Sequence, residues 1–362
     1  MDNRYPSLEI NLKHLRSNIE VVRKKCEEQG ICIAGVVKGA TGLKEVAECF
    51  RDAGVQYIAT SRMDQIVSLR KGGMNYPMML IRVPMMSECS DIAEYVDCSL
   101  QSELTVIRAV NMEAKRRSRV HDIILMADLG DLREGFWDKE AFLDCAEYIE
   151  KELENIHLLG IGTNVGCYGS VLATNEKLSE LVDLSKKVEE RIGRKLEIVS
   201  GGATSSLMRI WDHDIPDGIN QLRVGEGVLF ARDLAVYYGY DMSMLHHDVF
   251  KLKAEVIEVK VKPTHPVGEL AIDAFCRTPH YEDRGMRKRA LVAIGRVDFG
   301  DLSDIFPKEK GITLVGCSSD HTILDVEDCE RELVPGDIVE FDIDYGSLIY
   351  LSSTRTVNIR YI

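Results

Sequence analysis

Eight short apolar segments alternate with longer segments of helical period between residues 32 and 225. The apolar segments are typical of strands and read "CIAGVV" (32–37), "QYIAT" (56–60), "PMMLIRV" (77–83), "VDCSL" (96–100), "DIILMAD" (122–128), "HLLGIGTNV" (157–165), "LEIVSG" (196–201) and "NQLRVG" (220–225). One intervening segment, "NEKLSELVDLSKKVEERIG", has leucines at 178, 181 and 184 on one helix face and ends on Gly193, as a helix capped by glycine does. Strands that alternate with helices predict a parallel sheet. Eight units fit a (β/α)8 barrel better than the alternative, an open doubly wound sheet.

The pattern changes after about residue 245. "DVFKLKAEVIEVKVKP" alternates apolar and polar residues with period two, as a half-buried strand does. The segments "RALVAIGRVDF", "GITLVGCSSDHTILDV", "GDIVEFDIDYG" and "TRTVNIRYI" follow, separated by Gly, Pro and Asp, and helical patterns are scarce. We therefore predict a (β/α)8 barrel over residues 13–244 and a mostly β C-terminal domain over residues 245–362, which the strand in residues 1–12 joins.

The net charge limits the classes of binding partner, and the cysteine usage indicates the cellular compartment. The net charge of −14 argues against nucleic acid or an anionic membrane surface as a partner. No apolar run approaches the roughly 18 residues that a membrane span needs, and the first residues lack a signal-peptide pattern. The ten cysteines are irregularly spaced without a C-x-x-C pair, so we expect reduced thiols in a cytoplasmic protein.

Polar residues gather where the predicted strands end, which is where a parallel barrel places its functional groups. Lys38 follows "IAGVV", either as the solvated end of a strand or as a desolvated amine that acts as a nucleophile. The seventh strand ends in "SGGATSS" (200–206), whose backbone N–H groups and hydroxyls could hold an anion. The alternative is a flexible turn in which Thr204 or Ser205 caps a helix.

The eighth strand carries a second glycine-flanked loop, "RVGEG" (223–227), and neighbouring seventh and eighth strands are the usual phosphate site of this barrel. A lysine and a phosphate site that face one cavity are what pyridoxal 5′-phosphate requires, because this phosphorylated aldehyde is held as a lysine imine. A phosphorylated sugar substrate of an aldolase would need the same pair.

The chain resembles the alanine racemase-type (fold type III) pyridoxal-phosphate enzymes, in which a β domain follows the barrel. "VVKG" and "RVGEGVLF" match the pattern of that family. Within it the resemblance is to the ornithine racemase branch, through the segments "DLGDLREGF", "IVSGGATSS", "LRVGEGVLF", "YEDRGMRKRALVAIG" and "SSDHTILDV". The resemblance implies pyridoxal 5′-phosphate as cofactor and a head-to-tail homodimer in which the β domain of one subunit closes the barrel of the other.

The resemblance also implies roles for individual residues. Lys38 would carry the cofactor, Arg133 would lie near its phenolate, and Arg223 would face its ring nitrogen. The other expected cofactor-binding residues also lie at strand ends, and they are Asn164, Ser200, Gly202, Ala203, Thr204, Gly225 and Glu226. A guanidinium, which stays charged, disfavours protonation of the ring nitrogen, so the carbanion is short-lived and racemisation is favoured over transamination.

The sequence departs from the alanine racemases at three points. Gly39-Ala40-Thr41-Gly42 replaces their Ala-Asn-Ala-Tyr, Asn164 stands in place of a histidine, and "AIDAFCRTPHYED" lacks their tyrosine base. That stretch and "SSDH" are more similar to the D-threonine aldolase and D-serine dehydratase relatives, which hold a metal through a histidine. His321 has no clear partner ligand near the carboxyl terminus, so we predict no metal site.

The predicted function is that of a pyridoxal-phosphate-dependent amino acid racemase acting on ornithine or lysine. Lys38 would exchange the α-proton on one face, and a β-domain residue on the other. The candidates for this second base are Tyr281, His321 and Tyr345; each could equally be an ordinary, partly exposed polar residue. His321 has the strongest case because its unperturbed pKa lies near working pH.

Two other functions stay open, a metal-assisted pyridoxal-phosphate lyase acting on D-amino acids and a non-enzymatic carrier of the cofactor. For substrate selection, Glu282 and Asp283 in "HYED" are expected near the site entrance, where a carboxylate could pair with a distal ammonium. The alternative is that both carboxylates pair with the neighbouring basic run, which contains Arg284, Arg287, Lys288 and Arg289.

Overall fold

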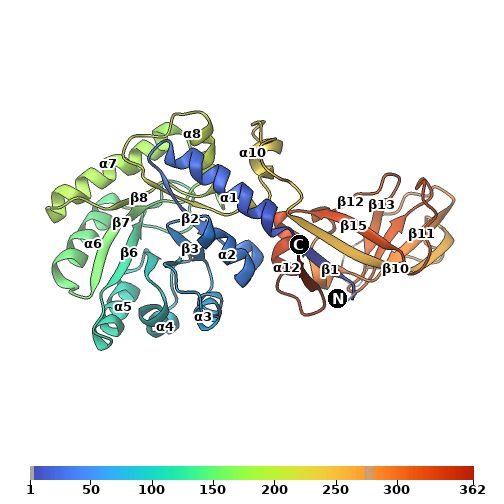
Figure 1. The fold of residues 1–362 in the computed structure, drawn as a ribbon, viewed down its shortest axis with the longest axis horizontal. Helices are drawn as coiled ribbons and strands as arrows, with labels where there is room; N and C mark the ends of the chain where they lie inside the picture. Colours follow the sequence, from blue (N-terminus) through green and yellow to red (C-terminus); the bar gives the residue numbers. More distant parts are fainter. Residues whose placement is uncertain (1–3, 274, 277, 279) are drawn as a thin grey trace. The chain divides into compact units, whose positions relative to one another are not determined.

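The computed structural model describes residues 4–273, 275–276, 278 and 280–362. The chain divides into two compact units. One unit is Lys13–His246, and the other combines Met1–Leu12 with His247–Ile362 (Figure 1).

The unit Lys13–His246 is built on a closed barrel of parallel strands in sequence order, in which the last strand pairs with the first. The strands are β2 (Cys32–Val36), β3 (Tyr57–Thr60), β4 (Met78–Leu80), β5 (Cys98–Gln101), β6 (His121–Met126), β7 (Ile156–Gly162), β8 (Ile198–Ser200) and β9 (Gln221–Val224). The predicted (β/α)8 barrel is therefore confirmed, and the open sheet is wrong.

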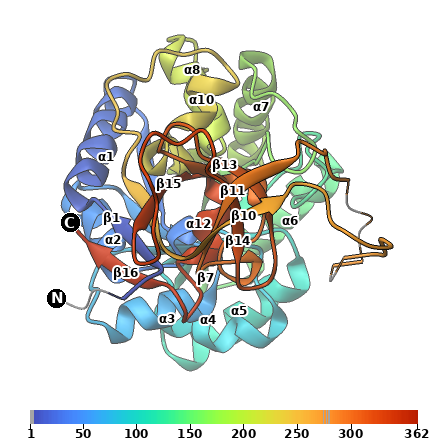
Figure 2. The same cartoon turned by 90° about the vertical axis from the view of Figure 1, so that its right-hand side faces the viewer.

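Helices surround the barrel, and Figure 2 shows α3 to α7 as part of a ring. The helices are α1 (Leu12–Glu27), α2 (Lys44–Asp52), α3 (Met63–Lys71), α4 (Cys89–Tyr95), α5 (Leu104–Arg116), α6 (Lys139–Glu152), α7 (Asn175–Ile192), α8 (Leu207–Trp211), α9 (Glu226–Leu229) and α10 (Arg232–Val236). In α7, Thr174 caps the first turn by accepting from the Lys177 N–H, and Gly193 ends the helix in the left-handed region at φ 76°. No helix within the described residues is long and apolar enough to cross a membrane.

Apolar side chains from the strands fill the core of this unit. One cluster of buried side chains in this core consists of Ala34, Val36, Ala59, Met79, Cys98, Leu100, Ile124, Met126 and Ile198. Because successive side chains of a strand point to opposite faces, Ala34 and Val36 share one face of β2. Lys38 comes two residues after Val36, just past the carboxyl end of the strand, where Val37 (φ −98°, ψ 5°) has already left the extended conformation.

The second unit is mostly antiparallel β-structure, as predicted. Its main sheet has the order β12-β15-β10-β11-β14-β13, and β1 pairs with both β10 and β16. The strands are β1 (Ser7–Ile10), β10 (Phe250–Pro263), β11 (Met286–Val292), β12 (Ile305–Pro307), β13 (Thr313–Cys317), β14 (Thr322–Asp325), β15 (Ile338–Ile343) and β16 (Asn358–Tyr361). The first part of β10 pairs with β1 and β15, and its second part pairs with β11. Among its described residues, this unit also has two short helices, α11 (Arg296–Phe299) and α12 (Tyr345–Leu351).

Candidate active site

Lys38 is half-buried and opens a single 3-10 turn, Lys38–Ala40, directly after β2. The turn is held by hydrogen bonds to the backbone, in which Val37 N donates to Ala59 O at 2.9 Å and Thr41 N donates to Lys38 O at 3.1 Å. Burial lowers the pKa of the Lys38 amine below its ordinary value. Lys38 is thus not the solvated end of a strand, and its burial makes the neutral, nucleophilic form easier to reach than in an exposed lysine.

Four charged or ionisable neighbours lie close enough to act on this amine. Cys167 and Glu134 raise the pKa of Lys38, whereas Arg133 and Arg223 lower it. Two of the four, Arg133 and Arg223, were expected from the sequence at this site. Glu134 and Cys167 were not.

Arg223 lies on β9 opposite Ala34 of β2 and is only 4% exposed. Its Nη1 donates to Ser200 Oγ at 2.5 Å, and its Nη2 donates to Thr163 O at 2.7 Å. Burial lowers the pKa of Arg223 to about 10, so the guanidinium is still protonated at neutral pH. The structure therefore holds a permanent positive charge among the barrel strands, fixed by two neutral acceptors.

The loops after β8 and β9 meet, as the two glycine-rich motifs predict. Thr204 Oγ1 accepts a hydrogen bond from Gly227 N at 3.1 Å, which joins the two loops. Gly202 has φ 113°, and a Cβ there would lie 2.6 Å from Ser206 Oγ. A Cβ on Gly225 would lie 3.0 Å from Val36 Cβ. Glycine at both positions therefore lets these loops pack closely against Ser206 and Val36.

Neither the Thr204 nor the Ser205 hydroxyl caps the helical turns that follow this loop, so the capping role in that alternative is wrong. The 3-10 turn Thr204–Ser206 is preceded by Ala203 and has no side-chain cap, and α8 is likewise uncapped by a side chain. Ser205 Oγ instead donates to Val165 O at 2.6 Å. That bond ties the loop after β8 to the loop after β7.

Glu226 lies at the start of α9, but its carboxylate is directed to the following helix. It accepts hydrogen bonds from Arg232 N at 3.1 Å and from Asp233 N at 3.3 Å. These bonds hold the amino end of α10. Any contact of Glu226 with an anion at the two loops would therefore come from its backbone N–H.

Asn164 follows β7 and is half-buried, and its Nδ2 is buried without a hydrogen-bond partner within the described part of the chain. A buried amide donor without an acceptor costs on the order of 1–3 kcal/mol. Such a donor at the carboxyl end of a barrel strand is what a bound oxygen ligand would satisfy.

The loop after β6 folds back on the strand. Phe136 N donates to Met126 O at 2.9 Å, and Asp128 N donates to Phe136 O at 3.0 Å. Within this loop, Arg133 Nη1 donates to Cys167 Sγ at 2.7 Å. Its Nε and Nη2 both bond the Glu134 carboxylate, with Nη2 to Oε1 at 2.5 Å. These bonds to Glu134 raise the pKa of Arg133.

Asp131 joins this loop to the loop after β7 and was missed by sequence reasoning. It is 1% exposed, and its carboxylate accepts from the N–H groups of Cys167, Tyr168 and Gly169 at 3.2, 3.1 and 3.2 Å. A Cβ on Gly169 would lie 2.6 Å from Asp131 O. The only signal in the sequence was the position of Asp131 inside "DLGDLREGF".

The three candidates for the second base lie on different elements of the β unit. His321 is exposed in the turn between β13 and β14, where its carbonyl accepts from Ser318 N at 2.8 Å. Tyr281 is 36% exposed, and its ring centroid lies 6.1 Å from that of His265. Tyr345 is half-buried at the start of α12. The stretch "AIDAFCRTPHYED" lies in part outside the described residues, at positions 274, 277 and 279.

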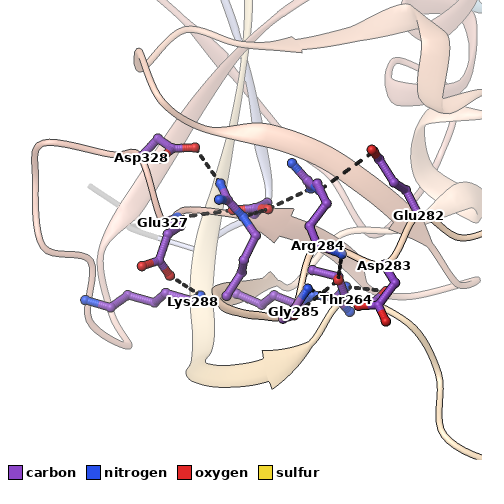
Figure 3. Close-up of polar contacts among 11 residues, drawn as sticks. Thr264, Glu282, Asp283, Arg284, Gly285, Lys288, Glu327 and Asp328 are labelled. Atoms are coloured by element: carbon purple, nitrogen blue, oxygen red, sulfur yellow. Dashed lines mark hydrogen bonds and ion pairs between the residues drawn. The ribbon is translucent and has the colours of Figure 1, made fainter.

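The acidic pair expected at the entrance is drawn in Figure 3. Glu282 is 81% exposed at its side chain, with its carboxylate 3.9 Å from Arg284 Nε. Asp283 Oδ1 accepts from Gly285 N at 3.0 Å and so holds its own turn.

The basic run has another principal partner. Asp325 accepts from Arg284 at 2.8 Å and from Arg287 at 2.6 Å. The alternative that both carboxylates of "HYED" pair with the basic run is therefore wrong for Asp283, and for Glu282 it holds only as a long contact.

Residues 10–233 match the family described as alanine racemase, N-terminal domain. The chain belongs to this family. It is 40% identical over 345 residues to an ornithine racemase of Acetoanaerobium sticklandii, covering 95% of this chain and 96% of that protein. It is 39% identical over 345 residues to a lysine racemase of Thermotoga maritima, covering 95% of each chain. The resemblance seen in the sequence motifs is thereby confirmed.

The family fold extends over both units. A solved alanine racemase of Clostridium difficile superposes with a TM-score of 0.76 at 21% identity, covering 100% of this chain and 97% of that one. At this identity the likeness shows the fold alone. The chain thus has the alanine racemase fold, including the β domain.

Proposed function

We propose that this protein is a pyridoxal 5′-phosphate-dependent amino acid racemase that acts on ornithine, with lysine as the next substrate. The observation that carries the proposal is Lys38, a half-buried amine of lowered pKa at a barrel strand end, within electrostatic reach of the buried Arg223. The choice of substrate is supported by the relatives of about 40% identity, whose names specify ornithine and lysine.

The residues at the strand ends fit this cofactor. Lys38 would hold it covalently, and the joined glycine-rich loops at Gly202 and Gly225 suit its phosphate, with N–H groups of Ala203, Thr204 and Glu226 as donors. The unsatisfied Nδ2 of Asn164 and the guanidinium of Arg133 suit its phenolate. Ser200 contributes by fixing Arg223 for the ring nitrogen.

When bound, the cofactor withdraws electrons from the substrate and so acidifies its α-carbon. Lys38 removes and returns the proton on one face, and its lowered pKa brings it towards the operating range of a general base. Arg223 stays positively charged and opposes ring protonation, which favours rapid return of the proton. The second face is served by a β-domain residue, with His321 preferred over Tyr281 and Tyr345.

The proposal includes a homodimer with composite sites in the cytoplasm. The cytoplasmic assignment is supported by the ten cysteines, all of which are described and free of disulfides. Glu282 and Asp283 remain proposed as contacts for a distal ammonium at the entrance.

The decisive experiment incubates the purified holoenzyme with single-enantiomer amino acids in deuterium oxide. Ornithine should racemise with deuterium incorporated at the α-carbon, and borohydride should fix the cofactor to Lys38. Cleavage to an aldehyde or ammonia would indicate a lyase, whereas bound cofactor without turnover would indicate a carrier. Full activity of Lys38→Ala would overturn the role of the lysine.

A further inference from the structure

Glu134 is a carboxylate in the barrel unit to which the sequence motifs gave no role. It lies in the loop between β6 and α6, two residues before Phe136, whose N–H bonds Met126 O at 2.9 Å. The backbone around Glu134 is therefore fixed to the strand end. Its side chain is only 14% exposed, whereas that of the adjacent Arg133 is 40% exposed.

The carboxylate lies among the cations of the site. It accepts hydrogen bonds from Nε and Nη2 of Arg133, whose Nη1 reaches Cys167 Sγ at 2.7 Å. Glu134 also raises the pKa of both Lys38 and Arg223. It is thus within electrostatic reach of the amine that would hold the cofactor.

The hydrogen bonds from Arg133 leave some acceptor sites of the Glu134 carboxylate unused. Two carboxylate oxygens offer about four lone-pair sites, and the two hydrogen bonds from Arg133 use two of them. The remaining sites can accept from an ammonium, which carries three donors.

We propose that Glu134 selects substrates whose side chain ends in an ammonium group, as in ornithine and lysine. This inference rests on the proposed function. The terminal nitrogen of ornithine is separated from the α-carbon by three methylenes, so a selecting carboxylate must lie inside the same strand-end site as Lys38. A largely buried carboxylate discriminates strongly, because a neutral side chain leaves its lone pairs unsatisfied. The exposed carboxylate of Glu282 would be screened by water and discriminate weakly.

The competing explanation is that Glu134 only holds Arg133 in place. Substrate comparison separates the two, with ornithine set against norvaline, which has the same carbon chain without the ammonium. In Glu134→Gln, kcat/KM for ornithine relative to norvaline should fall about 10- to 100-fold. If Glu134 only positions Arg133, or only tunes Lys38, both substrates fall together and the ratio stays at the wild-type value, which would overturn the inference.

A binding measurement gives a second readout that does not depend on turnover. With the cofactor fixed to Lys38 by borohydride, calorimetry should give a weaker Kd for ornithine in Glu134→Gln and an unchanged Kd for norvaline. Glu134→Asp keeps the charge and should restore part of the preference. Glu282→Gln tests the exposed entrance carboxylate in the same assay, and a fall of the ratio in Glu282→Gln with none in Glu134→Gln would contradict the assignment to Glu134.

These outcomes are distinct from failure of the proposed function. If wild-type protein racemises no amino acid, the proposed function fails, and the calorimetric comparison still decides whether Glu134 recognises the ammonium. If wild-type protein racemises ornithine and Glu134→Gln changes neither readout, only the inference fails.

Discussion

The guanidinium of Arg133 and the thiol of Cys167 lie 2.7 Å apart, Nη1 to Sγ, and join the loops that follow β6 and β7. Asp131 stabilises the same junction, because its carboxylate accepts hydrogen bonds from the N–H of Cys167 and of the two residues after it. The position of Arg133 therefore depends on a buried carboxylate that need not touch a ligand itself.

Asp131→Ala should loosen both loops. Three backbone N–H groups lose a charged acceptor, and the affinity for pyridoxal 5′-phosphate should fall at least about tenfold. Asp131→Asn keeps one acceptor oxygen and should lie between wild type and alanine. Fluorescence titration of cofactor-free protein measures this affinity, and an unchanged Kd in Asp131→Ala would show that the junction has no effect on the cofactor.

The charges around Lys38 should move its pKa in opposite directions. Because Arg133 lowers and Glu134 raises the pKa of Lys38, Arg133→Gln should raise it and Glu134→Gln should lower it further. Only the neutral amine attacks the cofactor aldehyde, so the attachment rate rises with pH up to this pKa. The midpoint of that pH profile in cofactor-free protein is the measurement, and shifts of the same sign in both variants would contradict the placement of the two charges.

Arg223→Glu should change the partition between reactions. A carboxylate allows protonation at the ring nitrogen, so transamination should increase relative to racemisation. The same change removes the donors to Ser200 Oγ and Thr163 O, and we expect a loss of about 1–3 kcal/mol in stability. Product ratios are therefore compared at a temperature where both proteins are folded, and an equal ratio would argue against Arg223 at the ring nitrogen.

His121 should make the barrel unit sensitive to acid. Burial lowers the pKa of His121 to about 4 from an ordinary 6.5, and its Nε2 lies 2.9 Å from Ser99 Oγ. Between these pH values the unfolded chain binds a proton that the folded chain does not. The contribution of neutral His121 to the free energy of unfolding is therefore fully present above about pH 6.5. It is lost as the pH falls towards 4, by on the order of 3 kcal/mol. Denaturant unfolding at several pH values should show a flatter profile for His121→Gln than for wild type.

The sequence was sufficient for those features that follow from local pattern. Alternation of strand and helix patterns predicted the barrel, and the rule that strand ends carry function located Lys38, Arg223 and the two glycine-rich loops. It could not reveal Asp131, Cys167 and Glu134 as a group, because their contacts depend on how two loops fold back against each other. The direction of the Glu226 side chain towards α10 is likewise set by tertiary contact.

The β unit shows the same limit at the level of strand pairing. Period two predicted a strand within residues 248–263. It did not predict that this strand pairs with β1 and β15 along its first part and with β11 along its second. A register shift between Val256 and Glu258 marks the change. Such pairing is decided by segments far apart in the chain.

The pairing of β1 with both β10 and β16 has a consequence for synthesis of the protein on the ribosome. Residues 7–10 are translated before the barrel, whereas their partners at 250–253 and 358–361 follow only after the whole barrel has been translated. At about 5–20 residues per second, the first strand waits on the order of ten seconds or more with both edges unpaired. The barrel can close during that interval, whereas the sheet that receives β1 cannot. An arrested nascent chain that stops after the barrel would therefore expose Ser7–Ile10 as an open strand, and it is at this stage that we expect the protein to depend most on chaperones.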